Sequence, residues 1–191
     1  SLNLKIENKI IFGKTDIKSD LYDIIYFVVQ DVMKTFTIPP NIKKISLWSF
    51  AKHAIETIII PPSVTEISDF AFYKCEKLEK VEMSDNSQLK KIGTSSFQET
   101  NIKSIQIPKH VTEIGQSCFG YCKNLTKCEF LENSELEIIG SFAFTESSIE
   151  YIKIPPLVTK ICTGTFINCS NLSQIDFQGD SLRIIDSDAF T

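Results

Sequence analysis

Residues 60–83 read IPPSVTEISDFAFYKCEKLEKVEM, and the same pattern returns at residues 107–130 and 154–177. Its phenylalanine and its cysteine therefore recur every 47 residues, at Phe72, Phe119 and Phe166 and at Cys75, Cys122 and Cys169. A fixed period of this length indicates one structural unit copied along the chain, and such units stack into a solenoid.

Each 47-residue period contains a second, related unit. Residues 89–107, LKKIGTSSFQETNIKSIQI, return as LEIIGSFAFTESSIEYIKI at residues 136–154. The two kinds of unit together predict about seven cells of roughly 22 to 25 residues over residues 35–191. The last cell stops after Phe190, so we expect the sequence to be part of a longer protein.

Every cell ends on a short stretch that alternates apolar and polar residues, such as Val81-Glu82-Met83 and Ile152-Lys153-Ile154. This period of two predicts a half-buried strand, and strands that recur with the cell should form a parallel sheet on one face. Prolines such as Pro108 follow the strands and should end them. For the other face we expect loops and a single helical or 3₁₀ turn that points its phenylalanine inward.

The pattern I-P-x-x-V-x-x-I-x-x-x-x-F-x-x-C-x-x-L-x-x-[VI]-x-[FM] resembles the leucine-rich repeat of BspA-like surface proteins, over about residues 35–191. Residues 22–27, which lead into Ile38-Pro39-Pro40, are similar to the start of such proteins from trichomonads. The resemblance implies an α/β-type leucine-rich repeat, and a cell-surface or secreted adhesin or antigen that binds host or extracellular proteins. Residues 1–34 do not fit the cell, and we expect them to be an N-terminal capping segment.

Composition excludes several classes of partner. A net charge of −4 and a pI near 5.3 give no electrostatic reason to bind nucleic acid. The longest apolar stretch, residues 24–29, is far too short for a membrane-spanning helix. The apolar last cell favours an end-to-end homodimer.

The six cysteines do not indicate disulfides or a metal site. Stacked strands lie about 4.8 Å apart, so cysteines two cells apart are separated by roughly 9.6 Å. That separation is beyond the reach of a disulfide, and buried free thiols are the alternative. Cys118, Cys122 and His110 lack the paired spacing of a structural zinc site.

Catalytic motifs are also missing from the sequence. The only histidines, His53 and His110, have no nucleophile beside them, and no glycine-rich phosphate loop occurs. We therefore expect no enzymatic activity, no catalytic residue and no cofactor.

The residues most exposed for binding are those that point outward from the predicted strands. They are Thr57, Ile59, Lys80, Glu82, Ser104, Gln106, Lys127, Glu129, Tyr151, Lys153, Gln174 and Asp176. Tyr151 is the best anchor for a protein ligand, since aromatic residues dominate binding hot spots. A merely solvated face with alternating charges is the alternative.

Two sequons, at Asn124 and Asn171, occupy matching positions before strands and could carry glycans in a secreted protein. Three functions stay open at this point: a protein-binding module of a surface adhesin, a passive structural spacer, and an intracellular scaffold.

Overall fold

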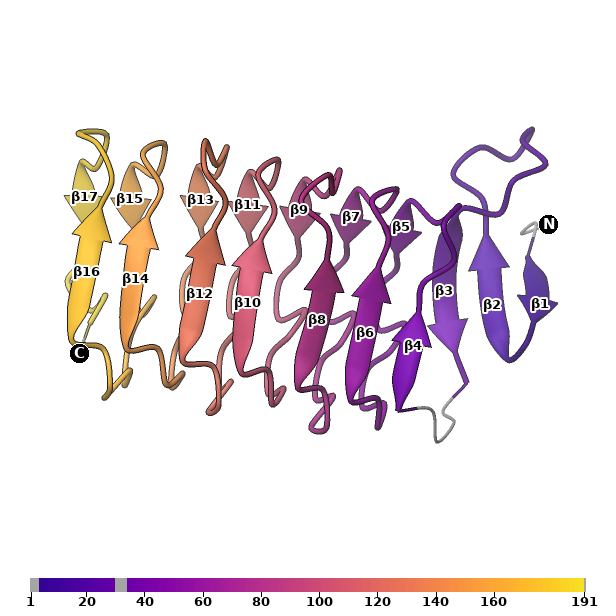
Figure 1. The fold of residues 1–191 in the computed structure, drawn as a ribbon, viewed down its shortest axis with the longest axis horizontal. Coiled ribbons are helices and arrows are strands. Elements are labelled where there is room, and N and C mark those ends of the chain that lie inside the picture. The colour runs from indigo at the N-terminus through magenta and orange to yellow at the C-terminus, as the bar shows by residue number, and fades with distance from the viewer. Residues whose placement is uncertain (1–3, 30–33, 191) are drawn as a thin grey trace.

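The computed structural model describes residues 4–29 and 34–190, which form a solenoid whose cells follow one another along the long axis (Figure 1). Each cell contributes one long strand to one face. The long strands are β4 (Thr35–Thr37), β6 (Thr57–Ile60), β8 (Lys80–Met83), β10 (Ser104–Ile107), β12 (Lys127–Phe130), β14 (Tyr151–Ile154) and β16 (Gln174–Phe177). They pair in parallel, as β4-β6-β8 and as β10-β12-β14-β16, so the predicted repeat solenoid with a parallel sheet on one face is confirmed.

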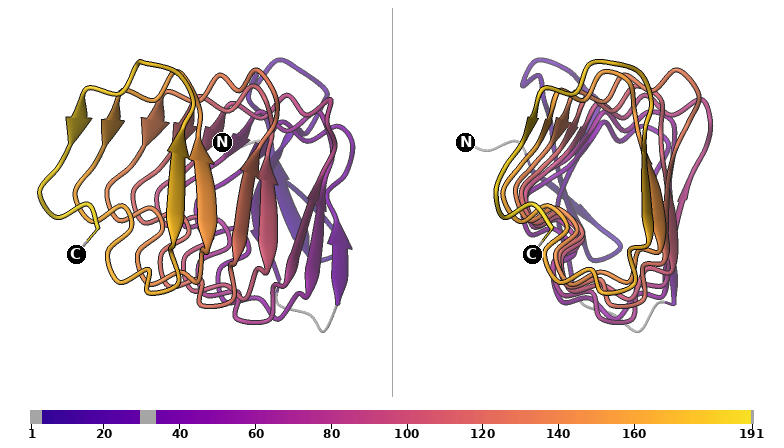
Figure 2. Two further views of the ribbon diagram at one scale, coloured as in Figure 1. Left: turned by 60° about the vertical axis from the view of Figure 1, so that its left-hand side comes forward. Right: turned by 90° about the vertical axis from the view of Figure 1, so that its left-hand side faces the viewer.

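A second parallel ladder, which the sequence did not reveal, lies on the opposite side of the coil. Its two-residue strands are β5 (Lys44–Ile45), β7 (Glu66–Ile67), β9 (Lys91–Ile92), β11 (Glu113–Ile114), β13 (Ile138–Ile139), β15 (Lys160–Ile161) and β17 (Ile184–Ile185). Viewed down the axis, the coils superimpose, with the long strands on one side and the short strands on the other (Figure 2). Among the described strands, the ladder of long strands is interrupted between β8 and β10 and that of short strands between β13 and β15. Elsewhere neighbouring coils pair on both sides of the core.

The core between the two ladders is a column of phenylalanine rings. Phe50, Phe72, Phe97, Phe119, Phe144, Phe166 and Phe190 stack one above another, with centroids of successive rings 5.0–5.6 Å apart. The inward strand residues, such as Ile58 and Ile105, are buried around this column. The prediction that the periodic phenylalanines point inward is confirmed.

The prediction of a helical or 3₁₀ turn is wrong, because the described residues contain no α-helix and no 3₁₀-helix. Consecutive β-turns take its place. Alternate backbone N–H groups of these turns point out of the turn and donate hydrogen bonds to the next cell. The N–H of Phe70 donates to the carbonyl of Thr94 at 2.8 Å, and the N–H of Phe72 donates to that of Ser96 at 2.8 Å. An α-helix would need those amides for its own i→i−4 bonds, so the contacts between cells exclude it.

The periodic cysteines connect neighbouring cells without any disulfide. The thiol of Cys75 donates to the carbonyl of Phe50 at 3.0 Å, and that of Cys122 donates to the carbonyl of Phe97 at 3.1 Å. In the first cell His53 has this role, with its Nε2 2.8 Å from the carbonyl of Val28. All six cysteines are free.

At the N-terminus, β2 (Ile10–Gly13) pairs antiparallel with both β1 (Lys5–Glu7) and β3 (Ile24–Val28), and β3 then pairs in parallel with β5. They lie at the first edge of the short-strand ladder (Figure 1). This position supports the proposal that residues 1–34 cap the solenoid, although residues 1–3 and 30–33 of that segment lie outside the described part. Within the described ranges, no helix has the length and hydropathy to cross a bilayer.

Candidate functional site: the outer face of the long strands

The strand residues predicted for binding lie on one face, in two rows that run along the solenoid. We call this face the strip. One row contains Thr57, Lys80, Ser104, Lys127, Tyr151 and Gln174, and the other contains Ile59, Glu82, Gln106, Glu129, Lys153 and Asp176. Most of these side chains are exposed, whereas Thr57, Ile59, Glu82 and Asp176 are half-buried. In the described part of the chain, strand pairing is interrupted between β8 and β10, so the strip crosses one break in the ladder.

In two strands of the strip, opposite charges neutralise each other. Lys80 Nζ lies 2.7 Å from Glu82 Oε1, and Lys127 Nζ lies 2.8 Å from Glu129 Oε1. Each pair joins residues i and i+2 of one strand, which point to the same side of the pleat. Exposed pairs of this kind contribute little stability, and they leave these parts of the strip without a strong local field.

The C-terminal part of the strip is held in a fixed arrangement by one hydrogen bond between β14 and β16 and one within β16. The hydroxyl of Tyr151 donates to Asp176 Oδ2 at 2.6 Å, and Gln174 Nε2 donates to Asp176 Oδ1 at 2.9 Å. Lys153 Nζ lies 5.9 Å from the centroid of the Tyr151 ring. We call these four residues the Tyr151 cluster.

The pKa values in the Tyr151 cluster follow from the same hydrogen bonds. The bond from Tyr151, followed by that from Gln174, lowers the pKa of Asp176 below its ordinary value. The bond to Asp176 raises the pKa of Tyr151 to about 12. At neutral pH the cluster therefore contains a carboxylate at Asp176 and a phenol at Tyr151, hydrogen-bonded to each other in defined positions.

The outer face of the short strands has a different character. Lysine and glutamate alternate there along Lys44, Glu66, Lys91 and Glu113, with Lys44 Nζ 2.8 Å from Glu66 Oε1 and Lys91 Nζ 3.2 Å from Glu113 Oε2. Burial alone would raise the pKa of Glu66, but hydrogen bonds from Lys44 and Ser68 outweigh it and lower the pKa. The charges on this face compensate one another between cells.

The remaining sequence candidates lie outside the strip. Asn124 and Asn171 are exposed in the turns that precede β12 and β16, and Asn124 Nδ2 donates to Asn101 Oδ1 at 3.2 Å. His110 Nδ1 lies 3.0 Å from Glu135 Oε1. Among the residues that the structure describes, no three His, Cys, Asp or Glu side chains are grouped as a metal site.

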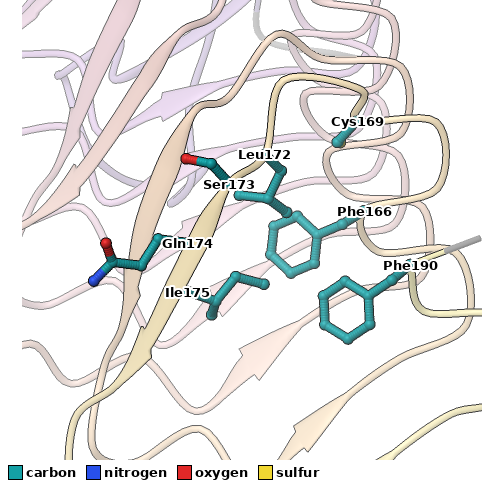
Figure 3. A pocket seen from close by; sticks show the side chains of 7 residues that line it. All are labelled: Phe166, Cys169, Leu172, Ser173, Gln174, Ile175 and Phe190. Atoms are coloured by element: carbon teal, nitrogen blue, oxygen red, sulfur yellow. The ribbon is translucent and has the colours of Figure 1, made fainter.

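A pocket of about 250 Å³ lies beside β16, on the side opposite the strip (Figure 3). The side chains of Phe166, Leu172, Ile175 and Phe190 converge on it, whereas Gln174 points away to the other side of the strand. These apolar groups continue the core of the preceding cells. The pocket thus lacks the convergent polar groups that orient a small ligand, and we assign it none.

The parallel ladders, the phenylalanine column and the long exposed strip together define a leucine-rich-repeat solenoid. A profile of the BspA type leucine-rich repeat region matches the chain with 6 copies, over residues 8–126 and 90–191. The chain belongs to the BspA-type leucine-rich repeat family, as the sequence pattern predicts.

Solved structures agree on the fold. A leucine-rich cell surface protein from Faecalibacterium prausnitzii is 26% identical, with a TM-score of 0.66, and the match covers 95% of this chain and 56% of that protein. The T. pallidum leucine-rich repeat protein gives a TM-score of 0.77 at 24% identity, covering 85% of this chain and 77% of that one. The pneumococcal vaccine antigen PcpA gives a TM-score of 0.72 at 18% identity, and the match covers 97% of this chain and 50% of that protein. No curated protein sequence matches the chain.

Proposed function

We propose that the chain is a non-enzymatic protein-interaction module of a cell-surface adhesin or antigen, and that it binds a host or extracellular protein through the strip. The observation that carries this proposal is the Tyr151 cluster. Tyr151 is exposed at 36%, yet its hydroxyl is already bonded to Asp176, so a partner would meet a side chain whose position is set in advance.

Interface energetics favour this part of the strip over the rest. Tyrosine supplies contact area at low entropic cost, and lysine and aspartate beside it can pair with opposite charges on a partner. The lysine–glutamate pairs of β8 and β12 would first have to separate before they could bind. We therefore place the anchor of the interface at Tyr151, with Ile59, Lys80, Glu82, Gln106, Lys127 and Glu129 as its periphery.

The likeness to a leucine-rich cell surface protein supports a surface or secreted location for this chain. Asn124 and Asn171 would then meet the glycosylation machinery, and both lie at turns rather than within the strip.

The double variant Tyr151→Ala with Lys153→Ala tests the proposed face. We expect it to recover at least about tenfold less partner than the wild type from a biotinylated host-cell surface extract, since losing a hot-spot residue costs about 2 kcal/mol or more. The matched control is Lys44→Ala with Glu66→Ala on the short-strand face, which should recover wild-type amounts. Tyr151→Phe keeps the ring but loses the bond to Asp176, and we expect an intermediate loss.

Equal recovery by the wild type and the Tyr151→Ala, Lys153→Ala variant would exclude the strip as the binding face. Recovery of no protein by either would instead favour a passive spacer.

A further inference from the structure

Three aromatic rings, one exposed and two half-buried, form a group in the turns that follow β5 and β7, outside the strip. We call this pair of turns the first corner of the solenoid. Trp48 and Phe70 are stacked with centroids 4.3 Å apart and planes 5° from parallel. Tyr73 stands edge-on to both, at 5.5 Å from Trp48 and 5.8 Å from Phe70. Trp48 is exposed at 43%, so the stack offers aromatic surface to solvent.

The backbone makes this an unfavourable place for large rings. Trp48 has φ 59° and Phe70 has φ 56°, in the left-handed region that bulky residues rarely adopt. The corresponding turn positions of the later cells hold serine at Ser95 and Ser117, and a single large ring at Phe142, which has φ 59°. Stacking of the two rings offsets part of the conformational cost of this backbone. The stack would do so equally well if the indole of Trp48 were buried, so stacking does not explain its exposure. The left-handed φ itself recurs along the repeat, so the feature that distinguishes the first corner is the presence of two large rings at successive copies of this position.

A basic pocket of about 400 Å³ lies beside these rings, in the same two turns. It is lined by Lys52, His53, Ala54, Lys74, Glu76 and Lys77. Lys74 joins the two features, because it lines the pocket and its Nζ lies 5.4 Å from the centroid of the Tyr73 ring. The same Nζ lies 3.3 Å from Glu99 Oε2, so a bound anion would compete with Glu99 for Lys74. Burial lowers the pKa of His53, so the lysines supply the positive charge at neutral pH.

The solenoid contains its own comparison for this corner. Two periods further along, the equivalent turns form a pocket of about 410 Å³, which is lined by Lys123, Glu146, Ser147, Ser148, Asn168 and Ser170. Glu146 and Asn168 stand there in place of Lys52 and Lys74. The backbone thus produces a pocket of the same size in both cells, but only the first one is rich in lysine.

The aromatic group is also specific to the first corner. Phe142, Gly164 and Ile167 occupy the positions of Trp48, Phe70 and Tyr73. The ring of Phe142 lies against Gly164, where a Cβ would come within 2.3 Å of it, so there is no second ring to stack on. The aromatic stack and the basic pocket therefore occur together at the first corner. The repeat requires neither of them, because its later copy lacks both.

We propose that this first corner binds an anionic saccharide, with a sugar ring against the Trp48–Phe70–Tyr73 group and a sulfate or carboxylate held by Lys52, Lys74 and Lys77. The C–H face of a sugar ring is apolar enough to pack on an aromatic surface while its hydroxyl groups stay in water. Lysine ammonium groups bind sulfate and carboxylate oxygens as mobile point charges. The pocket volume lies at the small end of the range of ligand sites, which suits one or two sugar units.

Trp48 is the single tryptophan of the chain, so its emission reports directly on this site. Titration with a heparin-derived hexasaccharide should change the emission of Trp48 and saturate. The variant Lys74→Asn with Lys77→Asn introduces the residues that the chain already holds at Asn168 and Asn171. We expect it to bind the hexasaccharide about tenfold or more weakly, since each lost charge-assisted bond costs about 1 kcal/mol or more.

Two variants separate the aromatic and the electrostatic contributions. Tyr73→Ile, which copies the residue at Ile167, should weaken binding several-fold while the lysines stay in place. Lys123→Ser, which removes a lysine from the second corner and copies Ser170, should bind like the wild type. Far-ultraviolet circular dichroism confirms that each variant is folded.

The proposal is overturned if Trp48 emission does not respond to the hexasaccharide, or if the Lys74→Asn, Lys77→Asn variant keeps its affinity. It is also overturned if inorganic sulfate or a hexaglutamate peptide binds as tightly, because either result would show a plain anion or acidic-peptide site. The Tyr151→Ala, Lys153→Ala variant should bind the hexasaccharide normally, so this test and that of the strip are independent.

Discussion

The variant Phe97→Ala is expected to lose about 3–5 kcal/mol of free energy of unfolding, the cost of removing a fully buried phenylalanine. Phe97 is exposed at 0%, and its ring lies between Phe72 at 5.1 Å and Phe119 at 5.6 Å. The cavity would open in the middle of the column, where neighbouring cells are held on both sides and cannot collapse into it. Urea denaturation followed by far-ultraviolet circular dichroism measures the loss.

Phe190→Ala is the matched control, because among the described residues its ring stacks on Phe166 alone and it is exposed at 42%. We expect a loss of about 1 kcal/mol or less, in proportion to the smaller apolar area that it buries. Similar losses for the two variants would mean that the rings contribute separately and that no continuous column stabilises the cells.

Alkaline pH should destabilise the protein more strongly than it does most domains. Burial raises the pKa of Cys75 to about 12 and that of Cys122 to about 11, and it also raises the pKa of Cys118 and Cys128. A thiol is neutral when protonated, so its stabilising effect is complete below the unfolded-state pKa near 9 and is lost as pH rises above it. At pH 11 each such thiol should lower the free energy of unfolding by about 3 kcal/mol, and the four together should lower it by an amount on the order of 10 kcal/mol.

The substitution Cys128→Val isolates one of these thiols. Cys128 pairs in register with Ile105, and the equivalent residue of β8 is Val81, so valine suits the site. We expect little change in the free energy of unfolding at pH 7 and a gain of about 3 kcal/mol relative to the wild type at pH 11. Denaturant titrations at the two pH values measure the difference, and an equal effect at both would contradict the role of thiol ionisation.

Much of the fold could be predicted from the sequence because the repeated residues are those that must be buried together. Phe72 and its copies, and the alternation at Val81-Glu82-Met83, follow directly from the period. The outward positions of the strip follow as well, since side chains alternate along a strand. The hydrogen bond between Tyr151 and Asp176 could not be predicted in this way, because it depends on rotamers across two strands.

Other features could not be predicted from the repeat pattern, for physical reasons. Strands such as Glu66–Ile67 are too short to show a period of two. The turns around Phe72 look helical because their apolar residues are three apart, but bonds to the next cell use the amides that a helix requires. For the first corner a signal was present in Trp48 and Phe70, since two successive copies of this position are aromatic there, whereas Ser95, Ser117 and Gly164 are small.

Hydrogen exchange at the turn amides tests most directly whether the cells are bonded to one another outside the sheets. The N–H groups of Phe72, Phe97, Phe119 and Phe144 donate to the following cell at 2.8–3.0 Å. They should therefore exchange as slowly as the central strand amides of Ile105 and Cys128. Exchange at these four amides at the rate of open loops, with the strands still protected, would contradict the stacked coil.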